Sequence, residues 1–341
     1  MTNIESNPEY FQPAEWAPHR AVWTAWPGAG EYWLEYLQPA QEQFTEMCRH
    51  IAPSEPMKIL VVDEAAQAAA EQALRGLNVS FFRVPYGDIW LRDTAPIFLH
   101  SRATGKLASL ACFQFNGWGE KYLMPPDDQV GVRIAEIVGL PVEHVPLVFE
   151  GGSLDVDGCG TALTTRECLL NANRNPALTQ GQIEQRIGQA VGVSKFLWLD
   201  YGLRNDHTDG HIDNLARFVG EGHVVCMAPS GPDDPNREVY DRVYQDLLSM
   251  RDALGRELTV TRIASPGLVR NHDGDIVPAS HMNFYIGNAT VVVPTYNTPY
   301  DDEAVAQLAE CFPGRKTVGL SADAILTGGG SFHCITQQEP W

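Results

Sequence analysis

The sequence predicts an α/β protein in which five similar units, each a β-hairpin with an added helix, close around a central axis as a pseudo-symmetric five-bladed propeller. Short β-branched or apolar runs alternate along the chain with amphipathic helical stretches. A polar cluster precedes successive hairpins at intervals of about 50 to 70 residues, near the period of a β-rich blade with one helix. Closure around an axis removes exposed sheet edges and brings the polar clusters, and with them an active site, to the axis.

Each element is predicted from its local pattern. Helices are expected where apolar residues recur at three- and four-residue spacing, at 31–51, 64–77, 131–138, 179–191, 236–254 and 302–312. Strands are expected at the short β-branched or apolar runs 58–62, 95–99, 107–115, 161–165, 215–219, 223–227, 283–286 and 290–294.

The polar clusters mark the proposed units. Their marker residues are Asp93, Glu150, His211, His281 and Ser331. The units share little sequence identity, so a mixed sheet of five unrelated strand–turn–strand pieces stays open as the alternative. Because no Pro/Gly/Ser linker or charge block marks a boundary, we expect residues 1–341 to form a single domain.

Composition and charge limit the classes of partner and the location that we expect for this protein. The 341 residues are 44% apolar and 20% charged, as in ordinary globular proteins. The formal net charge is −19, which would repel nucleic-acid phosphates and anionic membranes, so we expect neither as a partner and favour a small cation. The seven cysteines include no CxxC pair, and the sequence shows neither a leader pattern nor an apolar run of about 18 residues, which favours a reducing cytoplasmic location. The sequence leaves open whether the protein forms a homo-oligomer.

Cys334 is the candidate nucleophile. It follows the glycine-rich turn 328–330 and has polar neighbours, whereas most of the other cysteines lie in helical or strand patterns typical of inert buried thiols. A nucleophilic thiol requires an electropositive, partly exposed setting that favours the thiolate, so we expect such a setting here.

His211 and Asp213 form a second candidate pair within the polar run 205–214. If the following strand begins at His211, the two-residue alternation places both side chains on one face, with Ile212 on the other. An imidazole and a carboxylate would then point into one pocket.

Three further residues fit a pocket for a planar cation. Asp93 and Glu150 could cap or end local elements, but together with Asp213 they offer carboxylates for the donors of the cation. Trp90 offers an aromatic face to cover it.

The motifs that contain these residues resemble those of the agmatine deiminase family, which also includes bacterial peptidylarginine deiminases. The similarity extends from Glu15 to Gln338 and rests on EWAPH at 15–19 with Trp23 and Trp26-Pro27, WLRD at 90–93, FNGWG at 115–119, EGG at 150–152, TDGHID at 208–213, NFYI at 283–286 and HCITQQ at 333–338. The resemblance implies the five-bladed pentein propeller of guanidine-modifying enzymes. It also implies hydrolysis of agmatine to N-carbamoylputrescine and ammonia, a step of putrescine and polyamine biosynthesis.

The resemblance also implies a role for each matching residue. Cys334 would be the nucleophile that forms a covalent thiouronium intermediate, and His211 would be the general acid and base. Asp93 and Asp213 would grip the guanidinium, and Glu150 would orient and charge His211. This chemistry requires no metal ion or other cofactor.

The sequence departs from the family at His207, where many relatives have an acidic residue that meets the amine end of agmatine. Asp206 stands beside it, and both are candidate substrate-binding residues. His281 replaces a tyrosine of other members. The substrate could therefore be another guanidine, such as arginine or peptidylarginine.

Two other classes of function remain as alternatives. A metal-dependent hydrolase could use His207, His211, Asp213 and Cys334 as an N/O/S site, although the four-residue spacing of the histidines falls on a turn. A non-enzymatic propeller could bind a cationic ligand, but this leaves Cys334 without a role.

Overall fold

The computed structural model of the protein describes residues 9–28 and 33–341, and the strands in this part of the chain form five sheets. Their strand orders are β1-β5-β6-β7, β8-β9-β10, β11-β12-β13, β14-β15-β16 and β17-β2-β3-β4. The architecture is α/β.

The strands run as follows along the chain: β1 Tyr10–Phe11, β2 His19–Ala25, β3 Met57–Val61, β4 Val79–Arg83, β5 Ile97–Ser101, β6 Leu107–Gln114, β7 Val142–Val148, β8 Leu154–Val156, β9 Thr161–Thr165, β10 Lys195–Leu199, β11 Ala216–Gly220, β12 His223–Ala228, β13 Thr259–Ala264, β14 Tyr285–Ile286, β15 Thr290–Thr295, β16 Lys316–Ser321 and β17 Gln337–Pro340. The helices are α2 Leu37–Ile51, α3 Glu64–Ala73, α4 Leu91–Thr94, α5 Gly117–Glu120, α6 Asp127–Val138, α7 Arg166–Leu169, α8 Gln180–Val191, α9 Arg237–Ser249, α10 Asp301–Cys311 and α11 Asp323–Leu326, with 3-10 turns η1 Leu34–Tyr36, η2 Gly151–Ser153 and η3 Ile212–Asn214.

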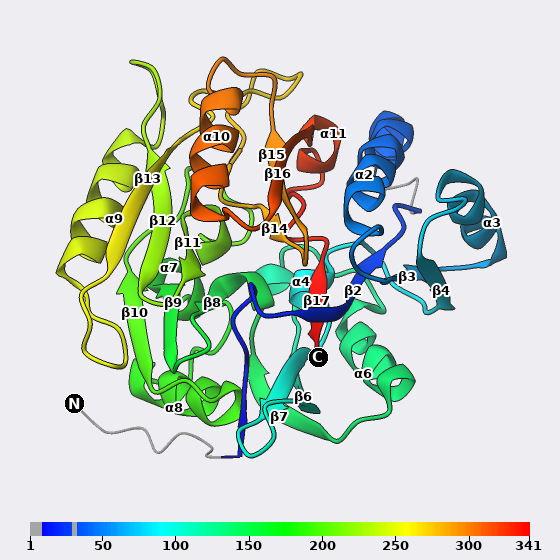
Figure 1. Ribbon diagram of the computed structural model, residues 1–341, viewed down its shortest axis with the longest axis horizontal. Helices are drawn as coiled ribbons and strands as arrows, with labels where there is room; N and C mark the ends of the chain where they lie inside the picture. The colour runs from blue at the N-terminus through cyan, green and yellow to red at the C-terminus, as the bar shows by residue number, and fades with distance from the viewer. Residues whose placement is uncertain (1–8, 29–32) are drawn as a thin grey trace.

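All five sheets share one plan. Each contains an antiparallel pair of strands, and the second strand of the pair is followed by a helix and a parallel strand. The connecting helices are α2, α6, α8, α9 and α10, since parallel neighbours require a crossover connection. Figure 1 shows these helices toward the outside of the view, with α4 and β17 nearer its centre.

The two ends of the described chain share one sheet. Strand β17 pairs antiparallel with β2, in the register Gln337 with Trp23 and Gln338 with Val22. The fifth polar cluster, which contains Ser331, therefore precedes an antiparallel pair whose second strand comes from the N-terminal segment. The predicted unit, a polar cluster before an antiparallel pair with an added helix, is present in all five sheets, and each sheet also has a parallel strand after the helix.

The predicted helices are present with shifted ends. Helix α8 matches best because Thr179 and Gln182 form a capping box at its start and Gly192 ends it in the left-handed conformation. Helix α9 stops at Ser249 because Met250 adopts an extended backbone. The start predicted at residue 31 lies outside the described residues, and the regular helix α2 follows the 3-10 turn η1.

The strand predicted at 215–219 is present as β11, but the condition that it begin at His211 is not met. The strand begins at Ala216, and Ile212–Asn214 forms the 3-10 turn η3. The turn buries Ile212 in the hydrophobic core, and His211 and Asp213 still come close together, but through the turn and not through strand alternation. Within the described residues, no helix is long and apolar enough to cross a membrane.

Candidate active site

Three of the predicted site residues converge on Gly152, which lies in the turn η2 just after Glu150. A Cβ atom added to Gly152 would stand 2.5 Å from His211 Nδ1, 2.9 Å from Asp213 Oδ2 and 3.1 Å from Asp93 Oδ1. Asp213 Oδ2 in turn lies 3.5 Å from Cys334 Sγ. The structure therefore brings together the thiol, the imidazole and two carboxylates from three polar clusters, one of which is the C-terminal glycine-rich segment.

Cys334 lies between α11 and β17 and is 4% exposed. Its Sγ accepts a hydrogen bond from Asn283 Nδ2 at 3.1 Å, and the Asn283 side-chain oxygen accepts from the Cys334 backbone N–H at 3.2 Å. Burial raises the pKa of the thiol well above its ordinary value, and the negative charges of Asp213 and Asp93 raise it further. The expectation of an electropositive, partly exposed setting is therefore wrong, because the free site surrounds the thiol with carboxylates.

His211 is fully buried between two carboxylates. Its Nε2 lies 3.4 Å from Glu150 Oε2, whereas its Nδ1 lies 3.9 Å from Asp93 Oδ1 and has no hydrogen-bond partner among the described residues. Burial opposes the charged ring, but the negative charge of Asp93 and the contact with Glu150 outweigh it and raise the pKa of His211 well above its ordinary value. The ring is thus an imidazolium with a free N–H on the side of Gly152.

Glu150 is held by a side chain that sequence reasoning missed. Arg174 Nε donates to Glu150 Oε1 at 3.0 Å and to Oε2 at 2.8 Å, and both side chains are buried. Burial alone would raise the pKa of Glu150, but His211 and Arg174 lower it below its ordinary value. Arg174 follows an asparagine in a loop, and no local pattern distinguishes it from a surface arginine.

Asp93 lies in the short helix α4 and is fixed at both oxygens. Oδ1 accepts from the Gly152 backbone N–H at 2.8 Å, and Oδ2 accepts from Trp118 Nε1 at 2.9 Å. Burial and the nearby charges of Glu150 and Asp213 raise the pKa of Asp93, against the opposing charge of His211.

Asp213 is fixed from one side only. Its Oδ2 accepts from His333 Nδ1 at 2.8 Å, while its Oδ1 is buried without a hydrogen-bond partner among the described residues. Burial would raise the pKa of Asp213, but the hydrogen bond and charge of His333 lower it. An ionised oxygen with no partner is an acceptor that a cationic ligand can satisfy.

Trp90 packs against the glycine-rich turn that leads to Cys334. Cβ atoms added to Gly328 and Gly330 would stand 2.8 Å and 2.7 Å from its ring, so only glycine allows this approach. The indole N–H donates to Asp88 at 2.8 Å, and the ring stacks on Trp33 with centroids 6.2 Å apart. Trp90 therefore forms a fixed aromatic wall beside the thiol.

Asp206 and His207 lie farther along the same loop as His211. Asp206 accepts hydrogen bonds from the Thr208 backbone and hydroxyl at 2.9 and 2.6 Å and from Asn214 at 3.2 Å. His207 is exposed and lies against Tyr122, and a Cβ added to Gly329 would stand 3.1 Å from its Nδ1. Asp206 is thus partly engaged within its loop, and His207 lies next to the glycine-rich turn.

The residues considered for a metal site do not form one set. Within residues 9–28 and 33–341, the ligand atoms close enough to hold an ion belong to Glu150, Cys168 and His211. His207, Asp213 and Cys334 are not part of this set. Arg174 already places a positive charge against both oxygens of Glu150. The geometry favours an ion-pair network over a metal centre.

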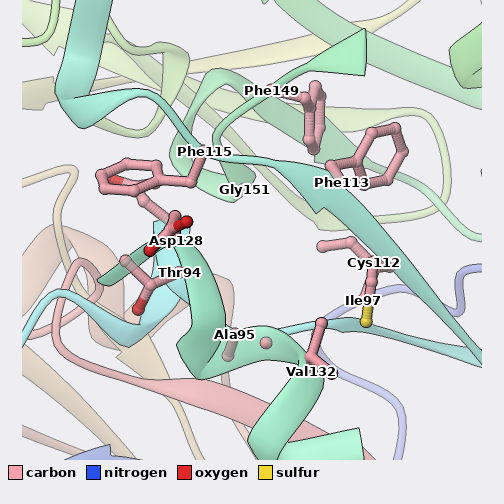
Figure 2. A pocket seen from close by; sticks show the side chains of 12 residues that line it. Thr94, Ala95, Ile97, Cys112, Phe113, Phe115, Asp128, Val132, Phe149 and Gly151 are labelled. Atoms are coloured by element: carbon pink, nitrogen blue, oxygen red, sulfur yellow. The ribbon is translucent and has the colours of Figure 1, made fainter. Parts of the chain in front are cut away.

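A small cavity is lined in part by Asp93, and Cys334 is not among its lining residues. Thr94, Ala95, Ile97, Cys112, Phe113, Phe115, Asp128, Val132, Phe149 and Gly151 line it, together with Asp93 and Gly131 (Figure 2). Its volume of about 20 Å³ has room for one water molecule and none for a guanidine with an alkyl tail.

The chain is similar to known proteins along nearly its whole length. Residues 11–340 match the family model of Porphyromonas-type peptidyl-arginine deiminases. The agmatine deiminase of Stutzerimonas stutzeri is 37% identical over 366 residues, which cover 100% of this chain and 99% of the relative. The structure of the agmatine deiminase of Enterococcus faecalis is 34% identical with a TM-score of 0.92, covering 99% of this chain and 98% of that one. An amidinotransferase from Microseira wollei, 11% identical with a TM-score of 0.53 over 97% of this chain and 96% of that one, shares the fold alone.

Proposed function

This chain belongs to the Porphyromonas-type peptidyl-arginine deiminase family, and from this premise we propose that it hydrolyses agmatine to N-carbamoylputrescine and ammonia. The observation that carries the proposal is the convergence of the Cys334 thiol, the His211 imidazolium and the carboxylates of Asp93 and Asp213 around Gly152. A planar cation with N–H donors on several sides fits such a set. The agmatine deiminases of Stutzerimonas stutzeri and Enterococcus faecalis support agmatine as the guanidine.

Binding begins with the charge of the guanidinium. At an effective dielectric constant near 20, a carboxylate at about 4 Å contributes roughly 4 kcal/mol of attraction, before a desolvation cost of comparable size. The net benefit is therefore orientation. Asp93, fixed by Gly152 and Trp118, and Asp213, fixed by His333, present acceptors in a set geometry, and Trp90 covers the cation.

The cation also activates the nucleophile. Asp213 and Asp93 raise the pKa of Cys334 in the free site, so the thiol is protonated there. A bound guanidinium offsets these two negative charges and lowers the pKa of the thiol, which then releases its proton to solvent. The hydrogen bond from Asn283 Nδ2 stabilises the resulting thiolate. The reactive form is thus made only when substrate is present.

The covalent steps use His211 twice. The Cys334 thiolate attacks the central guanidinium carbon, and the His211 imidazolium gives its Nδ1 proton to the departing amine, so ammonia leaves and a thiouronium forms. Neutral His211 then takes a proton from water, whose oxygen attacks the same carbon. The C–S bond breaks, the thiolate is restored, and the hydroxyl proton passes to the released ammonia as the neutral ureido product leaves. Glu150, held by Arg174, keeps the ring oriented and charged.

The loop at 206–207 is the proposed site for the tail of the substrate. Asp206 supplies a half-buried negative charge and His207 an exposed ring next to Gly329. If Asp206 binds the ammonium, Asp206→Asn will lower kcat/KM for agmatine and spare a guanidine with an uncharged tail. Equal losses for both would assign Asp206 to loop structure alone, through its bonds to Thr208 and Asn214.

A substrate panel tests the function directly. Agmatine, free arginine, peptidylarginine and shorter guanidines are assayed for ammonia and ureido product, and agmatine should have the highest kcat/KM. Faster turnover of arginine or peptidylarginine would overturn the substrate. Turnover of no guanidine would overturn the proposed function. Retained activity after chelation separates the cysteine mechanism from a metal-dependent hydrolase.

We also infer that the five sheets are the blades of one propeller domain over residues 1–341. The shared plan of the sheets and the pairing of β17 with β2 support this arrangement. A cytoplasmic location fits the seven cysteines, all of which are free.

A further inference from the structure

His333 lies between two carboxylates directly before the candidate nucleophile. Its Nδ1 lies 2.8 Å from Asp213 Oδ2, and its Nε2 lies 2.9 and 3.1 Å from the oxygens of Glu15. Both ring nitrogens therefore face acceptors, and only a doubly protonated ring can donate to both. The ring is 1% exposed, so water does not replace either bond.

The carboxylates around His333 belong to a buried network of ion pairs. Glu15 is paired with Arg92 at 3.0 Å and with Arg217, and Arg217 also pairs with Asp155. With Asp213, these residues comprise three carboxylates and two guanidinium groups, all buried. A buried carboxylate needs a donor, and His333 stands between the two carboxylates of Glu15 and Asp213.

We propose that His333 is a positioning residue for the guanidine reaction: it donates to Asp213 Oδ2 and is itself anchored by Glu15, so that Asp213 keeps its charge and leaves Oδ1 as the acceptor for the substrate cation. This inference rests on the proposed function of the site. The backbone supports it, because Asn283 Oδ1 accepts from the N–H groups of both His333 and Cys334, at 3.1 and 3.2 Å. The anchor of the carboxylate and the nucleophile therefore share one fixed backbone segment.

Two substitutions separate the two bonds of the ring. In His333→Asn, the amide nitrogen lies where Nδ1 was and can still donate to Asp213. In His333→Gln, the amide nitrogen lies where Nε2 was and can donate only to Glu15. If His333 positions Asp213, the Asn variant should keep more agmatine hydrolysis and more preference for a cationic reagent than the Gln variant. If His333 only anchors Glu15 for stability, the Gln variant should keep more of both.

The readout compares two reagents for Cys334. Chloroacetamidine carries a planar cation and iodoacetamide carries none, and each alkylates the thiolate by forming a C–S bond as the halide leaves. In His333→Gln, the preference for the amidine should fall by roughly tenfold or more, the loss expected for a hydrogen bond between charged groups. In His333→Asn, it should stay within about threefold of wild type. kcat/KM for agmatine should fall in the same order.

A matched control is available in His281, which is also buried with both ring nitrogens bonded, to Ala264 O at 2.7 Å and Asp301 Oδ1 at 2.8 Å. His281→Gln should lower thermal stability and leave the amidine preference unchanged. If the His333 variants do not fold, Glu15→Gln supplies the test. It removes the charged anchor of His333 Nε2, so it should lower the amidine preference of the folded protein, and an unchanged preference would overturn the anchored positioning of Asp213.

The outcomes are distinguishable from failure of the proposed function. Two results would overturn the positioning role even if wild type hydrolyses agmatine. One is an unchanged amidine preference in the folded His333→Gln protein, and the other is a higher amidine preference in His333→Gln than in His333→Asn. If wild type hydrolyses no guanidine, the proposed function fails, while the order of the labelling rates still decides what His333 does to Asp213.

Discussion

Gly152→Ala is the most direct test of the site geometry. The added methyl carbon would stand 2.5 Å from His211 Nδ1 and 2.9 Å from Asp213 Oδ2, where ordinary contacts begin near 3.4 Å. The backbone of Gly152 does not have a positive φ, so alanine is unfavourable only through these side chains. One or both side chains must move by about 1 Å, and a displacement of that size costs about 10²-fold in rate when it separates reacting groups.

The assay is steady-state hydrolysis of agmatine together with thermal unfolding. We expect kcat/KM to fall by about 10²-fold or more, with a loss of about 1 to 3 kcal/mol of unfolding free energy from overpacking. Gly181→Ala is the control, because Gly181 lies in α8 with nothing within 4 Å of an added Cβ. It should keep full activity and be neutral or slightly more stable.

Activity of Gly152→Ala within threefold of wild type would refute the convergence of His211, Asp213 and Asp93 on this point. Equal losses in Gly152→Ala and Gly181→Ala would show that the effect does not come from the site. A folded, inactive Gly152→Ala protein with Cys334 still accessible to iodoacetamide would localise the damage to the acid–base and cation-binding side chains.

Three further predictions follow from the same geometry. Cys334→Ser should have no measurable turnover in a folded protein, and chloroacetamidine should label Cys334 before the six other cysteines. If mass spectrometry finds another thiol labelled first, the assignment of Cys334 as the nucleophile is wrong. Asp213→Asn should lower kcat/KM for every guanidine regardless of its tail, by an amount that corresponds to roughly 2 to 4 kcal/mol of lost transition-state stabilisation, because a buried cation loses a charged partner. A loss confined to agmatine would contradict that reason. Because the pKa of Glu150 is lowered in the folded protein, its stabilisation is complete above the pKa of the unfolded chain and is lost as pH falls through the lowered folded value. The destabilisation by Glu150→Gln in denaturant titrations should therefore be large at pH 7 and shrink in acid, and an equal effect at both pH values would contradict the charged pairing with Arg174.

The sequence determined the repeated units and the chemistry they offer. Hydrophobic periodicity and turn residues are local properties, so the alternation of strands and helices could be predicted, as α8 with its capping box shows. Strand β3 was predicted, but the parallel third strands of the other four sheets, such as β7 and β16, escaped prediction because they are only partly buried and lack a clear pattern. The carboxylates of Asp93 and Asp213 and the ring of Trp90 indicated a pocket for a planar cation, and the resemblance to agmatine deiminases implied that this cation is a guanidine.

The tertiary structure alone determined how these groups act on one another. His333 and Glu15 are separated by 318 residues, and Arg174 meets Glu150 across a loop, so no local pattern could pair them. The pKa of Cys334 in the free site likewise depends on burial and on the carboxylates that face the thiol. Both follow from distances in the folded protein, which the residue types alone do not give. Sequence specifies the donors, acceptors and nucleophile, but the electrostatic free energy of a buried group depends on which charges the fold brings within a few ångströms of it.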